Sequence, residues 1–127
     1  MNNNHLLEIL IVEDNLSIRE LINAILNKNN FRTNYADNGS TALSILKEKD
    51  IDLVISDINM PVMGGIELLD CIKDNFSNPH PVIFVSGDPN YEELALKKGA
   101  IKFYTKPFPI TELLTFIESH FEEKLLV

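Results

Sequence analysis

Short apolar runs alternate along this chain with stripes of apolar residues at helical spacing. Five segments have the length and composition of β-strands, and they cover residues 9–12, 31–35, 53–55, 82–85 and 101–104. Between them and after the last one, apolar residues recur at intervals of three and four, as on the buried face of an amphipathic helix. The pattern therefore predicts five strands, each followed by a helix.

Capping residues mark the ends of two of these helices. Before the first helix, over residues 18–26, either Asn15 or Ser17 can serve as the N-cap, and Ser17 would form a capping box with Glu20. The fourth helix is predicted over residues 88–98, from an Asp-Pro pair to a glycine that follows its last turn. The remaining helices are predicted over residues 40–47, 66–72 and 110–121.

This regular alternation predicts an α/β fold. Strands that are apolar on both faces form parallel sheets with helices on both sides. Right-handed crossovers leave few topologies, and five units are too few for an eight-fold barrel. We therefore expect one open, doubly wound (βα)5 sheet with the strand order 2-1-3-4-5. With 127 residues, the chain is expected to be a single domain over residues 1–127, with a core of about 6–122 and no output domain.

Composition and charge limit the functions that this chain can have. Apolar residues make up 45% of the chain and charged residues 24%, which is an ordinary balance for a globular protein. The net charge of −8 argues against direct binding to nucleic acid or to anionic membranes. Apolar runs do not exceed four residues, the N-terminus lacks the basic region of a signal peptide, and Cys71 is the only cysteine. We therefore expect a cytoplasmic protein without a membrane-inserted segment.

Polar residues follow the predicted strands where the fold places ligand sites. Open α/β sheets bind ligands outside the carboxyl ends of their strands, at the point where the strand order reverses. Glu13 and Asp14 follow the first strand and Asp57 follows the third, which is its expected neighbour. Ser86 follows the fourth strand and Lys106 the fifth, on the other side of Asp57. These five side chains are expected to share one site.

The three clustered carboxylates predict a cation site. They repel one another unless a cation lies among them or a pKa rises. Mg²⁺ fits better than Zn²⁺, because the nearby ligands are oxygens and no histidine or cysteine is close in sequence. A carboxylate beside Mg²⁺ and the ammonium of Lys106 is suited to phosphoryl transfer. In that reaction Asp57 would be the nucleophile and would become an aspartyl phosphate.

The order and spacing of these residues resemble a known family, the response-regulator receiver domain of two-component signalling. The shared pattern consists of Glu13-Asp14, Asp57-Ile58-Asn59-Met60-Pro61, Gly64-Gly65, Ser86-Gly87 and Lys106-Pro107-Phe108. The resemblance covers nearly the whole chain and implies the CheY-like, or flavodoxin-like, form of the doubly wound sheet. Two positions depart from the common pattern, with Glu13 in place of an aspartate and Ser86 in place of a threonine.

The resemblance also implies roles for the residues of the acidic cluster. Asp57 would accept the phosphoryl group and contribute to the metal site. Asp14 would bind Mg²⁺ with the assistance of Glu13, and the backbone carbonyl of Asn59 would be a further ligand.

A second set of roles concerns the phosphoryl group and the response to it. Ser86 and Lys106 would bind its oxygens, and the Lys106–Pro107 bond would be cis. Phe103 matches the aromatic residue of the switch in this family. Phosphorylation would draw Ser86 toward Asp57 and let Phe103 turn inward, which would alter the surface of the fourth helix, fifth strand and fifth helix.

The function implied is a phosphorylation switch. A sensor histidine kinase or a histidine phosphotransfer protein would phosphorylate Asp57 in the presence of Mg²⁺, and a downstream protein would read the altered surface. The chain would catalyse only its own phosphotransfer and dephosphorylation, so it is not expected to be an enzyme. Lys97, Lys98, Lys102 and Lys106 lie in a stretch of ten residues without an acid, which is either a solvated face or the contact for an acidic partner.

The same residues bear on three alternative functions. A Mg²⁺-dependent phosphatase of the haloacid dehalogenase class needs an acid two residues after the nucleophile, where this chain has Asn59. An FMN carrier needs a phosphate-binding loop after the first strand, where Glu13 and Asp14 would repel the phosphate. An adaptor that acts without phosphorylation stays open as an alternative.

Overall fold

Strands and helices alternate in the protein as the sequence pattern predicts. The computed structural model describes residues 6–107 and 109–121. The strands are β1 (Glu8–Val12), β2 (Arg32–Ala36), β3 (Leu53–Ser56), β4 (Val82–Ser86) and β5 (Lys102–Thr105). The helices are α1 (Leu16–Lys28), α2 (Gly39–Glu48), α3 (Gly65–Asn75), α4 (Glu92–Lys97) and α5 (Ile110–His120), and a 3₁₀ turn, η1 (Pro89–Tyr91), precedes α4.

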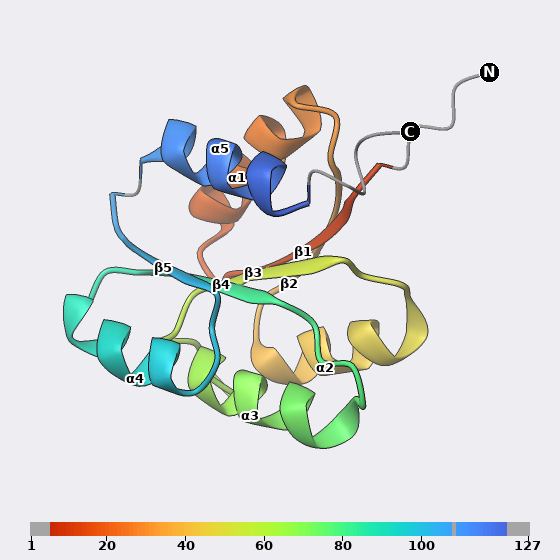
Figure 1. Cartoon of the computed structure of the whole chain (residues 1–127), viewed down its shortest axis with the longest axis vertical. Coiled ribbons are helices and arrows are strands. Elements are labelled where there is room, and N and C mark those ends of the chain that lie inside the picture. The colour runs from red at the N-terminus through yellow and green to blue at the C-terminus, as the bar shows by residue number, and fades with distance from the viewer. Residues whose placement is uncertain (1–5, 108, 122–127) are drawn as a thin grey trace.

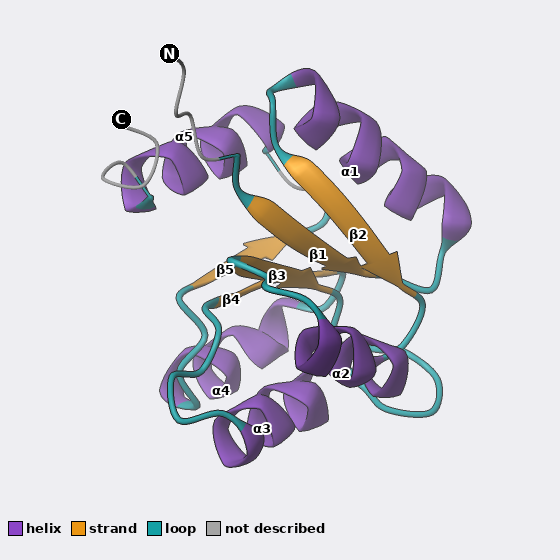
Figure 2. Cartoon of the chain, turned by 90° about the vertical axis from the view of Figure 1, so that its right-hand side faces the viewer, coloured by secondary structure: helices purple, strands orange, loops and turns teal. Residues whose placement is uncertain are grey.

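The five strands form one parallel sheet in the order β2-β1-β3-β4-β5, which confirms the predicted topology. Helices α1 and α5 cover one face, and α2, α3 and α4 cover the other (Figures 1 and 2). The register places Val12 beside Ser56 at the ends of the two central strands. The residues that follow them therefore leave the sheet side by side at its switch point.

An apolar layer on each face holds the helices against the sheet. Leu10 and Val12 of β1 point to the layer under α2 and α3, whereas Ile9 and Ile11 point to the layer under α1 and α5. Every residue of β3 and β4 is buried. Phe84 of β4 is completely buried, and the burial of one such side chain stabilises the fold by about 2–3 kcal/mol. The central strands are apolar on both faces, as predicted.

The edge strand β2 is less buried than the central strands. Thr33 of β2 is only half-buried, and Tyr35 is 57% exposed. The guanidinium carbon of Arg19 lies 4.9 Å from the centroid of the Tyr35 ring, so this ring is covered by a cation instead of by core. Tyr35 therefore lies outside the core although it belongs to a strand of the sheet.

Asn15 provides the N-cap of α1. Its side-chain oxygen accepts a hydrogen bond of 3.0 Å from the backbone N–H of Ile18. The alternative capping box is wrong, because Ser17 lies inside the helix.

The fourth helix is shorter than predicted. Asp88 does act as an N-cap, but it caps η1, where its Oδ1 accepts a bond of 2.9 Å from the N–H of Asn90. The α-helix itself contains only six residues and ends at Lys97. Gly99 follows with a φ of 111°, the left-handed conformation that the sequence predicts for a glycine at this position. A short helix preceded by a 3₁₀ turn has few hydrogen bonds of its own to hold it in place.

Gly65 allows α3 to begin directly against the end of β3. A Cβ atom at this position would lie 2.3 Å from the carbonyl oxygen of Asp57 and 2.8 Å from Cε1 of Phe84. The first atom belongs to the backbone after β3 and the second to a fully buried ring of β4, so neither has room to move.

We expect Gly65→Ala to lower the free energy of unfolding by about 1–3 kcal/mol, because the new methyl group overpacks this contact. Urea denaturation followed by circular dichroism measures the change. Gly87→Ala is the matched control, since a Cβ there has nothing within 4 Å, and its effect should stay within about 0.5 kcal/mol. Equal destabilisation by the two variants would contradict the role given to Gly65.

Candidate functional site

Three carboxylates converge where β1 and β3 leave the sheet. One oxygen from each of Glu13, Asp14 and Asp57 lies within 4.8 Å of the other two. The parallel pairing of β1 with β3 causes this convergence, because Glu13 follows Val12 and Asp57 follows the paired Ser56. The structure thus brings together the three acidic residues that the sequence placed in one site.

The three carboxylates have different surroundings. Glu13 is only 3% exposed, and its Oε2 accepts a bond of 3.2 Å from the N–H of Asn15. The side chain of Asp57 is 12% exposed, and its Oδ1 accepts a bond of 2.6 Å from the N–H of Ile58. Asp14 is exposed. Backbone donors therefore orient two of the carboxylates, while the third faces solvent.

Lys106 bridges the two oriented carboxylates. Its Nζ lies 3.0 Å from Oε1 of Glu13 and 3.2 Å from Oδ2 of Asp57. The backbone N–H of Lys106 donates a bond of 2.7 Å to the carbonyl of Ser86, which ties this residue to the end of β4. The Lys106–Pro107 bond is cis, as the resemblance implies. One ammonium group thus partly offsets the negative charge of the cluster.

Burial and ion pairing shift the pKa values of this pair. Burial raises the pKa of Glu13, and the hydrogen bond from Lys106 offsets part of that rise. Burial by itself would lower the pKa of Lys106, but its hydrogen bond to Glu13 and the charge of Asp57 outweigh burial and raise it. Lys106 is therefore a cation at neutral pH.

The other residues that the sequence singles out differ in burial and in their contacts. Ser86 is fully buried, and its Oγ accepts a bond of 3.1 Å from the N–H of Asp88 at the start of η1. Phe103 is 7% exposed and packs in the core layer under α2, α3 and α4. The resemblance implies that Phe103 turns inward on phosphorylation, but its ring already lies in the core. Burial favours this position, because the ring is apolar and has no hydroxyl group. Asn59 is exposed in the loop after β3, and its carbonyl as a metal ligand stays a prediction.

Comparison with known proteins decides the family. The sequence profile described as "Response regulator receiver domain" matches residues 9–118. The chain belongs to this family. Receivers are signalling domains of two-component systems, and the predicted family is confirmed.

Individual relatives agree with that assignment. The receiver is 34% identical over 114 residues to sporulation initiation phosphotransferase F of Bacillus subtilis, an alignment that covers 89% of this chain and 92% of the relative. It superposes with a TM-score of 0.82 on the response regulator TrrA of Thermotoga maritima in complex with Mg²⁺ and BeF, with 28% identity and coverage of 90% and 98%. It superposes with a TM-score of 0.85 on the Ssk1 receiver of Saccharomyces cerevisiae, solved with the histidine phosphotransfer protein Ypd1, with 26% identity and coverage of 99% and 96%.

Arg19 is a residue of the receiver site that the sequence did not reveal. Its Nη1 donates a bond of 3.2 Å to the backbone carbonyl of Glu13, while its guanidinium covers Tyr35. Arg19 thus holds the loop that carries the acidic pair against α1 and β2. Helical periodicity could not indicate this contact, because Arg19 lies on α1 among residues that simply face outward in the pattern.

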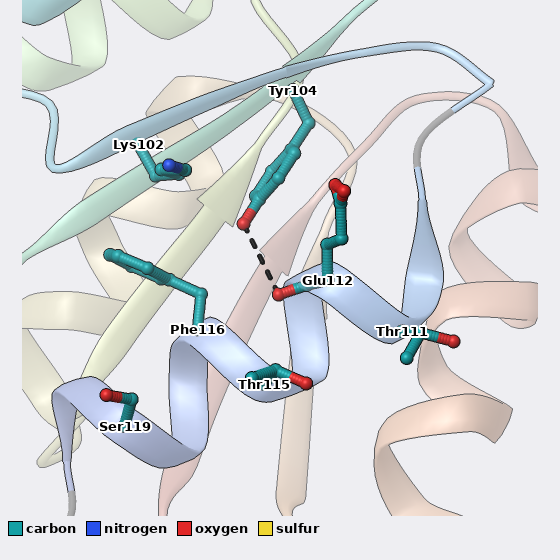
Figure 3. Close-up of a pocket in the computed structure, with 7 residues that line it drawn as sticks. All are labelled: Lys102, Tyr104, Thr111, Glu112, Thr115, Phe116 and Ser119. Carbon is teal, nitrogen blue, oxygen red and sulfur yellow. Dashed lines mark hydrogen bonds between the residues drawn. The ribbon is translucent and has the colours of Figure 1, made fainter.

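Two surface features flank the site of the receiver. An apolar patch beside Lys106 is formed by Ile18, Leu21, Pro107 and Ile110, and Leu21 in it is 52% exposed. Farther along β5, an open groove between β5 and α5 contains Lys102, Tyr104 and Phe116 (Figure 3). The Lys102 ammonium lies 5.8 Å from the centroid of the Tyr104 ring and 5.4 Å from that of Phe116. The first surface lies next to the acidic cluster and the second lies along the edge of the sheet.

None of the helices in the described ranges of the chain has the length and apolar character needed to span a bilayer.

We expect Lys106→Met to lower the free energy of unfolding by about 2 kcal/mol at neutral pH, because buried Glu13 then lacks its cation. Adding Glu13→Gln to this variant removes the unpaired charge and should recover part of the loss. A double-mutant cycle from urea denaturation measures the coupling between the two side chains. Additive effects of the two substitutions would show that the ion pair does not stabilise the fold.

Proposed function

We propose that this receiver is a phosphorylation switch in which Asp57 accepts a phosphoryl group in a Mg²⁺-dependent reaction. The observation that carries the proposal is the position of the Lys106 ammonium, 3.2 Å from Asp57 Oδ2 and 3.0 Å from Glu13 Oε1, at the edge of the three-carboxylate cluster. The arrangement combines a nucleophilic carboxylate, a fixed cation and an acidic site for a metal ion. The similarity to a regulator solved with Mg²⁺ and BeF supports it.

The donor set suits Mg²⁺. The cluster offers only carboxylate oxygens, and a hard divalent cation prefers such ligands. Asp14, which is exposed, would be the main ligand, while Glu13 is partly engaged by Lys106 and would assist. Asp57 and the carbonyl of Asn59 would complete the protein ligands. When bound, the ion would neutralise charge on the phosphoryl oxygens during transfer.

The protein side chains perform the rest of the transfer. A carboxylate oxygen of Asp57 attacks the phosphorus of the donor, and the bond from phosphorus to the leaving group breaks as the new P–O bond forms. The N–H of Ile58 holds Asp57 Oδ1, so the carboxylate is fixed in orientation before the donor arrives. Lys106 neutralises negative charge on the group that is transferred.

The donor would be a sensor histidine kinase or a histidine phosphotransfer protein. A protein that presents a phosphohistidine to Asp57 would come against the surface beside Lys106, where the apolar patch of Ile18, Leu21, Pro107 and Ile110 lies. The receiver of Ssk1, similar over nearly the whole chain, was solved with such a phosphotransfer protein. We assign the patch to docking of the phosphodonor.

The response would pass through Ser86. A phosphoryl group on Asp57 offers strong acceptors, and the Ser86 hydroxyl can turn to donate to one of them. That turn would break the bond of 3.1 Å from the N–H of Asp88 and release η1 at the start of α4. The change would reach the surface of α4, β5 and α5, including the groove in Figure 3, where a downstream protein would bind. Phe103 as a further part of the switch stays a prediction.

Three further expectations from the sequence stay predictions. They are the single domain over residues 1–127, the cytoplasmic location, and the absence of an enzymatic activity other than transfer to and from Asp57.

We expect the purified receiver to take up one phosphoryl group from a small acyl-phosphate donor in the presence of Mg²⁺, because the site itself supplies nucleophile and cation. Intact-protein mass spectrometry measures the uptake, and peptide mapping should place the label on Asp57. Asp57→Asn should abolish it, and Asp14→Asn should abolish the part that depends on Mg²⁺.

The matched control for these variants is Asp50→Asn. Asp50 is exposed and precedes β3, so it lies at the opposite end of the sheet, and its replacement should leave uptake unchanged. Label on Ser56 or Ser86 would contradict the acceptor assignment. If the parent chain took up no label from either an acyl phosphate or a phosphorylated histidine protein, an adaptor without phosphorylation would be the better function.

We also expect Ser86→Ala to accept a phosphoryl group but to transmit it poorly. In the parent chain, phosphorylation should shift the amide signals of residues 86–98 and 101–106 in NMR spectra, whereas β2 should change little. Ser86→Ala should lose most of the shifts beyond residue 88. Ser56→Ala, which also removes a buried hydroxyl at the end of a strand, is the control and should keep them. Full shifts in phosphorylated Ser86→Ala would rule out this route.

A further inference from the structure

A basic groove lies at the end of the molecule opposite Asp57. It opens at the amino ends of β4 and β5, with α3 and α4 on one side and the last residue of α5 on the other, and this open groove has a volume of about 570 Å³. Figure 1 shows α3 and α4 together on one face of the sheet and α5 on the other face. This volume is within the usual range of sites for small ligands.

Cations dominate the lining of this groove. Its side chains include Lys73, Lys97 and Lys98 but no aspartate or glutamate, although the whole chain carries a net charge of −8. Contacts within the protein fix the positions of two of these lysine ammonium groups. Lys73 Nζ donates a bond of 2.8 Å to the carbonyl of Lys98, and Lys98 Nζ lies 3.2 Å from each carboxylate oxygen of Asp70. The groove therefore has a preorganised positive edge.

Lys97 adds an ammonium group that is available to a ligand. It is exposed in the last turn of α4, and no other side chain or backbone group in the described part of the protein pairs with it. A phosphate group could engage it together with the ammonium groups of Lys73 and Lys98, which keep unused N–H donors.

The interior of the groove combines an apolar wall with a half-buried histidine. Leu69, Pro81 and Ile101 contribute the wall. His80 also lines the groove, and its Nδ1 is the one buried side-chain nitrogen or oxygen without a hydrogen-bond partner among residues 6–107 and 109–121. Because Nδ1 itself is buried, a ligand in the groove would contact the exposed part of the half-buried ring instead. Burial lowers the pKa of His80, so the ring is neutral at neutral pH.

We propose that this groove binds a phosphorylated small molecule of the nucleoside diphosphate type. Its phosphates would lie on Lys73, Lys97 and Lys98, and its flat base would lie on the wall of Leu69 and Ile101 beside the ring of His80. Because Lys97 ends α4, a bound ligand would contact the helix through which we propose the response to phosphorylation to pass. That consequence rests on the proposed function, but the binding itself does not.

The test is an NMR titration of the whole chain with ADP in the absence of divalent cations. We expect saturable shifts of the amide signals of Lys73 and residues 97–101, and of the imidazole signals of His80 and His120. Inorganic pyrophosphate should shift the same signals but bind more weakly than ADP, because it has no base to lie on the apolar wall.

Matched lysine variants make the test specific. Lys97→Glu should weaken ADP binding by about tenfold or more, since it replaces a charge-assisted contact by repulsion. Lys47→Glu is the control, because Lys47 is also an exposed lysine in the last turn of a helix, and it should change the affinity by less than about twofold. Asp57→Asn should bind ADP like the parent chain, so the result does not depend on the phosphorylation site.

Several outcomes would overturn the proposal. They are the absence of saturable shifts at millimolar ADP, equal losses in Lys97→Glu and Lys47→Glu, equal affinities for ADP and pyrophosphate, and shifts centred on Asp57 instead of on the groove. A short glutamate-rich peptide that bound more tightly than ADP and depended on Lys97 would assign the groove to an acidic protein partner instead.

Discussion

The ion pair that Lys106 forms with Glu13 and Asp57 is the interaction on which the site depends. Three carboxylates within 4.8 Å of one another would otherwise repel, and a nearby cation favours the charged form of Glu13, which is only 3% exposed. The pair joins the end of β5 to the ends of β1 and β3, across a separation of 93 residues in sequence. One contact thus holds the acidic cluster together and places a cation where a phosphoryl group would arrive.

The sheet register makes this contact possible. Parallel strands bring all their carboxyl ends to one edge, and the order β2-β1-β3-β4-β5 puts the residues after β1 and β3 next to each other. Ser86 and Lys106 are tied together at the same edge, because the N–H of Lys106 donates to the carbonyl of Ser86. Close packing at Gly65 then fixes the backbone of Asp57 against α3. The packed core positions the site, whereas the six-residue helix α4 makes few contacts with the rest of the protein.

Charge is distributed unevenly between the two ends of the molecule. The edge at the carboxyl ends of the strands carries the acidic cluster, and the opposite end carries the groove of Lys73, Lys97 and Lys98. The four lysines between residues 97 and 106 therefore do not form one basic face. Lys97 and Lys98 lie at the groove, Lys102 lies over two aromatic rings, and Lys106 is part of the acidic site. The protein thus carries two chemically different surfaces, one acidic and one basic.

The sequence by itself determined the fold class, the strand order and the residues that meet at the site. Periodicity and the rule that ligands bind at the carboxyl ends of parallel strands are enough to place Glu13, Asp14, Asp57, Ser86 and Lys106 together. Only the tertiary structure decided how each of them is held. The bond from Asp88 to Ser86, the buried position of Phe103 and the exposed ring of Tyr35 depend on packing between elements. The contact of Arg19 and the basic groove likewise join residues from different elements, and a local pattern along the chain carries no information about such pairs.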